Sequence, residues 1–331
     1  MEIERVKGAK AADPFPVYDD PVASLLVAHT RDDSGRDAVV AHVLGTCAGY
    51  AYADTGTVAM VMARLGLGDN ACVRVSQTVD AMFVFSTVYL VQSRCGRIVI
   101  LCYRGTEPGN LFNWLGDADT ESEPMGLDAE SARVHAGFHR NVRATRLAVT
   151  NELQHALERR SLLDPTTNVD HPLEALYVTG HSLGGAMAAL LALSVAGTAS
   201  NPAIAEKLRA VYTFGQPMVL VEPLPKLALT VGRRLFRHIT TRDIIPALPA
   251  TTWGKFAHFG QEYRLSKGEW QRSEIPTAPL TNMRQVPRSV LALLSAAKLR
   301  DASRYTLAEH GPHNYIAALR PRGKVTEFGD R

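Results

Sequence analysis

The segment at residues 180–185, which reads Gly-His-Ser-Leu-Gly-Gly, carries the clearest chemical pattern in this sequence. It contains Gly-x-Ser-x-Gly, a pattern that is weak taken alone. Its surroundings strengthen it, because an apolar, strand-like run ends at Thr179 and an Ala-rich helical segment begins just after Ser182. A serine on a tight turn from a strand to a helix is the arrangement of a nucleophile elbow. The alternative is a glycine-rich helix start in which Ser182 caps the helix.

The elbow interpretation gives each neighbour of Ser182 a physical role. Side chains at Gly180 and Gly184 would collide with the adjacent strand and helix, so glycine fits at both positions. The backbone amide of Leu183 would point at the space above the serine oxygen, where it and the helix dipole would favour a developing oxyanion. We therefore expect Ser182 to be a nucleophile and Leu183 to supply one oxyanion-hole donor.

A serine hydroxyl is a poor nucleophile unless a base and an acid that orients the base assist it. In elbow hydrolases these follow the serine in the order acid, then histidine. Asp243 is the best acid, because it follows the strand-like segment 235–241 and would lie on the same sheet edge as Ser182. A turn or helix-cap aspartate is the alternative interpretation of this residue.

Three histidines lie after Asp243 in the sequence, and each is a candidate for the base. His258 lies in an alternating, strand-like run, which indicates a structural ring. His310 is favoured, because Gly311-Pro312 predicts a helix start and leaves His310 on the loop before it. His313, inside the first turn of that helix, is the alternative base.

The elements around these residues predict the fold class. Runs of apolar and β-branched residues predict strands, helical composition predicts the segments between them, and residues 97–103 are apolar at successive positions, as in a strand buried on both faces. Strands separated by helices favour an α/β fold with a central, mostly parallel sheet and helices on both faces. The expected strands are 81–93, 97–103, 175–179, 210–214 and 236–241, and the expected helices are 134–161, 183–196, 289–299 and 312–319.

Length, composition and charge limit the classes of function and the domain organisation that the chain can have. The chain has 331 residues and a net charge of +3, which is too weak and too scattered to indicate nucleic-acid binding. We expect a loose tail over residues 1–20, followed by a single domain over 21–331 that contains a cap or insertion at 271–308.

Four cysteines without a Cys-x-x-Cys pair favour buried, reduced thiols. No apolar signal segment or membrane-spanning stretch is visible, which favours a cytoplasmic or peripheral membrane location.

Several blocks in order resemble the class 3 lipases, the fungal-lipase-like branch of the α/β hydrolases. The resemblance covers roughly residues 80–320, and the blocks together are far more specific than the elbow alone. These blocks are 103–106 with 113–115 and Asp117, 134–138, 180–186, 213–217, 239–249 and the histidine segment 310–315.

The resemblance implies a triad of Ser182, Asp243 and a histidine, and a second oxyanion donor at Thr106. It also implies that residues 108–120 form a lid over the active site. The apolar residues of that segment also fit a small amphipathic helix that covers an acyl pocket and opens at a lipid surface. The residues in question are Leu111, Phe112, Trp114 and Leu115. A packed core aromatic is the alternative interpretation of Trp114.

The sequence therefore predicts a serine hydrolase of carboxylic esters, of the lipase or esterase type, acting on a lipid or small ester substrate at a membrane or lipid-droplet surface. A phospholipase, an aryl-ester esterase and a non-catalytic lipid-binding module are the alternatives. No cofactor is expected. No metal site is expected either, because His135 and His139 lack the glutamate of a zinc-binding helix.

Overall fold

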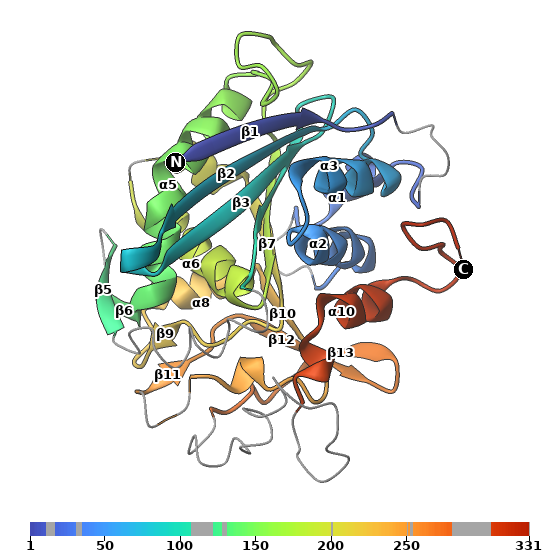
Figure 1. Ribbon diagram of the computed structural model, residues 1–331. Coiled ribbons are helices and arrows are strands. Elements are labelled where there is room, and N and C mark those ends of the chain that lie inside the picture. The colour runs from blue at the N-terminus through green and yellow to red at the C-terminus, as the bar shows by residue number, and fades with distance from the viewer. Residues whose placement is uncertain are drawn as a thin grey trace.

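The computed structural model of this chain describes residues 1–10, 17–30, 35–106, 122–127, 131–199, 201–249, 251, 254–279 and 306–330. Within these residues a large sheet runs through the molecule with helices on both faces (Figure 1). Its nine strands, in spatial order, are β1 (Glu2–Lys7), β2 (Ala71–Val79), β3 (Val84–Gln92), β4 (Ile98–Tyr103), β7 (Ala175–His181), β8 (Leu208–Phe214), β10 (Leu235–Ile239), β12 (Gln261–Ser266) and β13 (Glu269–Ser273).

The middle of this sheet is parallel, as predicted. Strands β4, β7, β8, β10 and β12 pair in parallel, and antiparallel pairs extend the sheet on both sides. A smaller antiparallel sheet lies beside it, formed by β5 (Ser122–Gly126), β6 (Ser131–His135), β9 (Leu220–Val221) and β11 (Phe256–Ala257). The parallel order brings the carboxyl ends of β7, β8 and β10 to one edge of the sheet, where side chains from distant segments can meet.

Helices cover the two faces of the sheet (Figure 1). One face carries α1 (Pro21–Val27), α2 (Ala38–Tyr50), α3 (Thr55–Arg64) and α10 (Pro312–Leu319), and the other carries α5 (Ala136–Leu157), α6 (Leu183–Gly197), α7 (Pro202–Lys207) and α8 (Lys226–Gly232). Three short 3-10 turns complete the described elements, η1 (Asp80–Met82), η2 (Ile245–Ala247) and η5 (Ala308–His310). No helix in these ranges is both long and apolar enough to cross a membrane.

Strand β4 shows why the sheet needs both helical layers. All six of its residues are buried, and they alternate between two hydrophobic clusters. Val99, Leu101 and Tyr103 belong to the cluster that contains the apolar residues of α5 and α6, whereas Ile98 and Ile100 belong to the cluster with α2 and α3. A continuous apolar run is the expected sequence of a strand covered on both faces.

The amino terminus differs from the loose tail that the sequence predicted. Residues Glu2–Lys7 form β1, which pairs with β2 along its whole length. The Arg5 guanidinium forms an ion pair with Glu152 of α5, whose side chain is almost fully buried. Strand pairing and this ion pair hold the segment on the sheet, although its residues carry few apolar side chains.

The domain boundaries stay a prediction, and part of the expected cap lies outside the described residues. Of the segment 271–308, residues 280–305, which include the apolar helix predicted at 289–299, are not described. Its first residues belong to β13, which pairs with β12 at the edge of the sheet. The lid residues Leu111, Phe112, Trp114 and Leu115 also lie outside the described ranges.

Candidate active site

Ser182 lies at the turn between β7 and α6 and has the strained backbone of an elbow. Its φ is 59° and its ψ is −128°, in a region that residues with a side chain rarely adopt. Its amide donates to the carbonyl of Phe214 at 2.8 Å, which fixes the turn against the end of β8. The hydroxyl Oγ is buried and has no hydrogen-bond partner among the described residues.

Close packing explains the glycines beside Ser182. A Cβ on Gly180 would overlap the backbone of Gly184, and a Cβ on Gly184 would overlap the carbonyl of Tyr103 at the end of β4. The first turn of α6 is therefore pressed against the loop that follows β4. That close approach is the physical reason for two glycines flanking the serine.

Both expected oxyanion donors lie next to this turn. Leu183 opens α6, so its amide has no acceptor inside the helix. Thr106 is half-buried and follows β4 by three residues. The glycine before it, Gly105, is packed so closely that a Cβ would lie 2.6 Å from the carbonyl oxygen of His181. The residue before Thr106 is thus in contact with the residue before Ser182.

Asp243 and His310 form a buried pair. His310 Nδ1 lies 2.8 Å from Asp243 Oδ2, and the two side chains are 3% and 0% exposed. The same carboxylate oxygen accepts a hydrogen bond from the Tyr315 hydroxyl at 2.6 Å, and Oδ1 accepts one from the Ile245 amide at 2.9 Å. His310 Nε2 is buried and has no partner among the described residues. The ring therefore has one nitrogen held by the acid and the other available.

The loop that carries His310 is bound to the loop that carries Asp243. Asp243 and Thr306 form an isolated parallel bridge, in which the Thr306 amide donates to the carbonyl of Arg242 at 2.7 Å. Thr240 Oγ1 donates to the carbonyl of Glu309 at 3.1 Å. The acid and the histidine are therefore fixed to each other by backbone contacts as well as by their side chains.

Gly215 connects this pair to the serine turn. It follows Phe214, which accepts the hydrogen bond from the Ser182 amide, and its φ is +61°. A Cβ at this position would lie 2.7 Å from Asp243 Oδ2 and 2.9 Å from His310 Nδ1. The backbone at the end of β8 is thus in contact with the serine turn on one side and with the Asp243–His310 pair on the other.

His181 contacts both the backbone and the ring of His310. Its Nε2 donates to the His310 carbonyl at 2.7 Å, its Nδ1 accepts from the Tyr52 hydroxyl at 2.8 Å, and its ring centroid lies 4.5 Å from that of His310. Burial, followed by the charge of His310, holds the pKa of His181 well below its ordinary value. A neutral ring with both nitrogens engaged fixes the backbone of His310. The sequence analysis missed this role, because nothing in the sequence pairs Tyr52 with residue 181.

The other histidines lie in different surroundings. His313 is exposed in the first turn of α10, and no contact with Asp243 is found for it among the described residues. His258 is buried with Nε2 at 2.7 Å from the Pro246 carbonyl. His139 Nδ1 forms a hydrogen bond with the Glu123 carboxylate. The described residues contain no group of three or more His, Cys, Asp or Glu side chains that could hold a metal ion.

Known proteins that resemble this chain in sequence are lipases. Residues 100–253 match the family model described as Lipase (class 3), a range that includes Ser182 and Asp243. Over this range, a little under half of the chain, the sequence is similar to the class 3 lipases. A lipase of Rhizomucor miehei is 29% identical over 185 residues, which cover 56% of this chain and 46% of that protein. A triacylglycerol lipase of Ricinus communis is 26% identical over 216 residues, 55% of this chain and 40% of that protein.

The likeness to known lipases in fold extends beyond the matched range. The structure of lipase II from Rhizopus niveus superposes with a TM-score of 0.53 at 21% identity, covering 72% of this chain and 85% of that chain. At that identity the likeness shows the fold alone. The chain spans about half the length of the curated relatives it matches.

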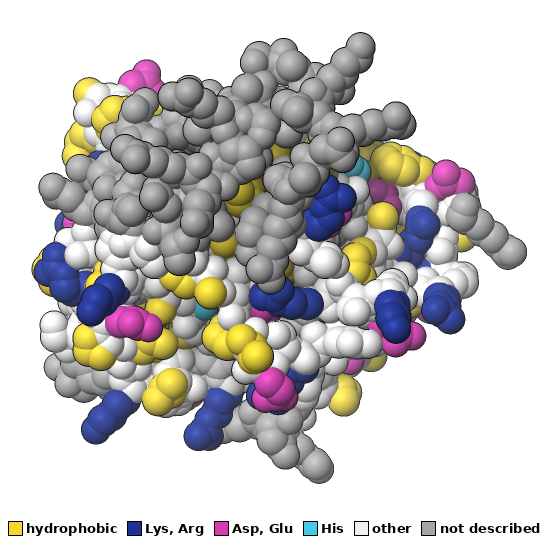
Figure 2. Space-filling model, turned by 90° about the horizontal axis from the view of Figure 1, so that it is seen from below, with side chains coloured by type: hydrophobic (Ala, Val, Ile, Leu, Met, Phe, Trp, Pro, Cys, Tyr) yellow, Lys and Arg dark blue, Asp and Glu magenta, His cyan; other side chains and the backbone are white. Residues whose placement is uncertain are grey.

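On the face of the molecule seen from below, the described side chains carry charges of both signs. Figure 2 shows hydrophobic side chains interspersed with Lys, Arg, Asp and Glu over the part of that face not drawn in grey. This is the side toward which β9, β11 and β13 lie in Figure 1.

Proposed function

We propose that this chain hydrolyses carboxylic esters of lipids, with Ser182 as nucleophile, His310 as base and Asp243 as the acid that orients it. The observation that carries the proposal is the buried Asp243–His310 pair, held through Gly215 beside a strained serine turn. Ser182 Oγ and His310 Nε2 are both buried and without partners in the described structure, as expected of two atoms that exchange a proton with each other and with a substrate.

In the first half of the reaction, Ser182 Oγ attacks the ester carbonyl carbon while His310 Nε2 takes the hydroxyl proton. The imidazolium that forms keeps its Nδ1–H on Asp243 Oδ2. It then gives the new proton to the departing alkoxide, so that the alcohol leaves and the acyl group stays on the serine. In the second half, His310 Nε2 takes a proton from water and the hydroxide attacks the acyl carbon. The bond to Ser182 Oγ then breaks, the imidazolium returns its proton to Oγ, and the carboxylic acid leaves.

The tetrahedral intermediate of each half needs donors for its oxyanion. The amides of Leu183 and Thr106 would supply them, one from the start of α6 and one from the loop after β4. Removal of a single oxyanion donor costs roughly 10²–10³ in kcat in serine hydrolases. The Thr106 hydroxyl is a third donor that could serve the same charge.

The substrate class follows from the family, whose relatives include a triacylglycerol lipase and a mono- and diacylglycerol lipase. We therefore propose acylglycerols or related lipid esters as substrates, presented at a membrane or lipid-droplet surface. Opening of residues 108–120 at that surface stays a prediction.

The test is a panel of p-nitrophenyl and glycerol esters of increasing chain length, together with a phospholipid, each with and without a lipid interface. Ser182→Ala should lose at least about 10³-fold in turnover. A fluorophosphonate probe should label the parent chain once and the Ser182→Ala chain not at all. Equal turnover of the two chains would refute the assignment, and absence of both turnover and labelling would favour a non-catalytic lipid-binding module.

A further inference from the structure

A pocket lies away from the serine turn, where α8 meets β10 and β12. Its volume is about 640 Å³, within the range of small-molecule sites. Ser182, Asp243 and His310 are not among its described lining residues. The residues that line it include Leu224, Leu229, Arg233, Arg237, His258 and Arg272.

Arg237 brings a buried charge to this pocket. Its side chain is 1% exposed, its Nε donates to the Phe259 carbonyl at 2.9 Å, and its Nη2 lies 3.1 Å from Glu262 Oε2. Its Nη1 is buried and has no partner among the described residues. Leaving a buried donor unpaired costs free energy, more so for a charged group, and a bound acceptor would remove that cost.

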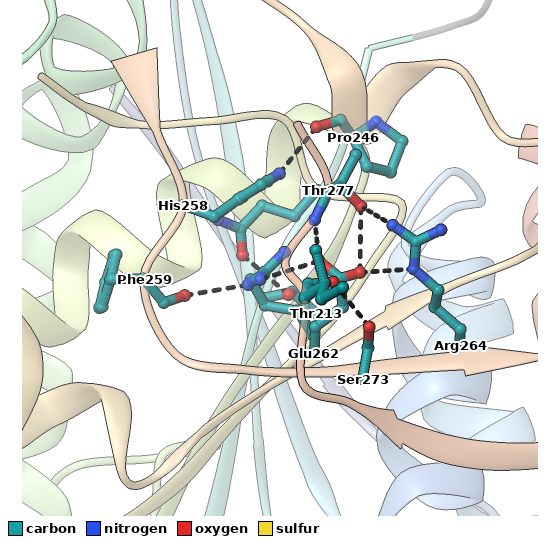
Figure 3. Close-up of polar contacts among 11 residues, drawn as sticks. Thr213, Pro246, His258, Phe259, Glu262, Arg264, Ser273 and Thr277 are labelled. Atoms are coloured by element: carbon teal, nitrogen blue, oxygen red, sulfur yellow. Dashed lines mark hydrogen bonds and ion pairs between the residues drawn. The ribbon is translucent and has the colours of Figure 1, made fainter. Parts of the chain in front are cut away.

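Glu262 does not balance the positive charge around the pocket. Figure 3 shows its carboxylate at the centre of a cluster of polar contacts. It also accepts from Arg264 and from the amide of Thr277 at 2.8 Å. Arg233 and Arg272 add two exposed guanidinium groups to the pocket lining, and no described lining residue is acidic. The pocket therefore favours an anion, and arginine is well suited to phosphate and carboxylate oxygens.

His258 adds a second unpaired polar atom to the same lining. Its Nε2 donates to the Pro246 carbonyl, as Figure 3 shows, while its Nδ1 is buried without a partner among the described residues. Burial, followed by the charge of Arg237, holds the pKa of His258 well below its ordinary value, so the ring is neutral and Nδ1 accepts. A headgroup that carries both an oxyanion and a hydroxyl would satisfy Arg237 and His258 together.

Phosphate monoesters have this combination of groups. Near pH 6, close to the second pKa of a phosphate monoester, a large fraction carries one P–OH donor beside its oxyanions, whereas a carboxylate offers only acceptors. Apart from Gln261, the remaining lining residues are apolar side chains and glycines, among them Leu224, Leu229 and Pro276. Leu229 is 65% exposed, so an alkyl chain could cover it and remove apolar surface from water.

We infer that this pocket binds a single-chain amphiphile with a phosphate monoester headgroup, its oxyanions on the arginines and its alkyl chain over Leu224 and Leu229. This site is separate from the proposed catalytic machinery. Its occupancy therefore does not require that the chain hydrolyse anything.

The test is calorimetric titration of the full chain carrying Ser182→Ala, at pH 6, with decyl phosphate below its micelle concentration. Decanoate, decanol and inorganic phosphate are titrated in parallel. Arg233→Gln combined with Arg272→Gln changes only exposed side chains and should weaken decyl phosphate binding at least tenfold. Lys10→Gln combined with Arg322→Gln removes the same number of positive charges at exposed positions that do not line the pocket. This matched control should bind within twofold of the parent.

Decyl phosphate should bind more tightly than decanoate, decanol or inorganic phosphate. Equal affinity for decyl phosphate and decanol would overturn the headgroup assignment, and equal affinity for inorganic phosphate would overturn the amphiphile. Tighter binding of decanoate would overturn the role given to His258. Unchanged binding in the double arginine variant would place the ligand elsewhere. Each of these outcomes is independent of ester turnover, so it is distinguishable from a failure of the proposed function.

Discussion

His310 Nδ1 and Asp243 Oδ2 lie 2.8 Å apart in a buried contact, and further hydrogen bonds to both carboxylate oxygens fix the orientation of Asp243. Its Oδ2 also accepts the Tyr315 hydroxyl at 2.6 Å, and its Oδ1 accepts the Ile245 amide. The acid is thus held by the first residues of η2 on one side and by α10 on the other. A carboxylate fixed in this way holds the histidine in one tautomer and one orientation before any substrate arrives.

The first prediction concerns the Tyr315 hydroxyl. Burial, followed by the charge of Asp243, raises the pKa of Tyr315 well above its ordinary value, so the hydroxyl stays a donor. We expect Tyr315→Phe to lower kcat about 10-fold or more, because a hydrogen bond to a charged group contributes about 1.5–3 kcal/mol. The measurement is ester turnover together with the melting temperature.

The control for that variant is Tyr50→Phe. Tyr50 also donates to a carboxylate, Glu327 Oε1, at 2.6 Å, but at the end of α2 rather than at the proposed active site. Its loss should lower stability without lowering kcat. A Tyr315→Phe chain that matches the Tyr50→Phe chain in both readouts would show that Tyr315 acts only on stability.

Local pattern was enough to predict the strand and helix on either side of Ser182 and the helix that follows His310. The strand and helix around Ser182 follow from an apolar run that changes to a helical composition, and the helix predicted at 312–319 is α10 (Pro312–Leu319). Strand β12 was missed, because Glu262 faces a buried arginine instead of an apolar core and so breaks the expected alternation. The Tyr52–His181 contact joins residues 129 positions apart, and no periodicity signals such a pair.

The second prediction separates the two candidate bases. His310 contacts Asp243, whereas His313 is exposed in the first turn of α10. We expect His310→Ala to lose roughly 10³–10⁴-fold in kcat, as removal of a triad member does in other serine hydrolases. His313→Ala should keep kcat within a factor of about three of the parent, a change of under roughly 1 kcal/mol. Loss of turnover in the His313→Ala chain alone would reverse the assignment.

The third prediction concerns stability in acid. Burial lowers the pKa of His29 and of His42 to about 4, against about 6.5 in an unfolded chain. Below pH 6.5 the unfolded state therefore binds more protons than the native state, and stability is lost as the pH falls from 6.5 to 4. The loss is on the order of 3 kcal/mol for each histidine. Urea unfolding at pH 7, 5.5 and 4.5 measures it.

A matched pair of variants tests that assignment. His42→Gln should flatten the dependence of unfolding free energy on pH between 6.5 and 4.5, because the side chain no longer titrates. His171→Gln, at an exposed histidine, should leave the dependence unchanged. If both variants keep the slope of the parent chain, the acid sensitivity has another source.

The last prediction uses Gly215, whose backbone contacts the Asp243–His310 pair. An alanine there would adopt a φ of +61° and place its Cβ 2.7 Å from Asp243 Oδ2, so the pair must separate. Gly268 has a φ of +80° with nothing within 4 Å of an added Cβ, so Gly268→Ala imposes comparable backbone strain, about 1–2 kcal/mol, without the contact. We expect both variants to lose stability, Gly215→Ala the more because of the added overlap, and only Gly215→Ala to lose turnover, by about 100-fold or more. Equal turnover in the two folded variants would mean that the contact at Gly215 does not set the geometry of the catalytic pair.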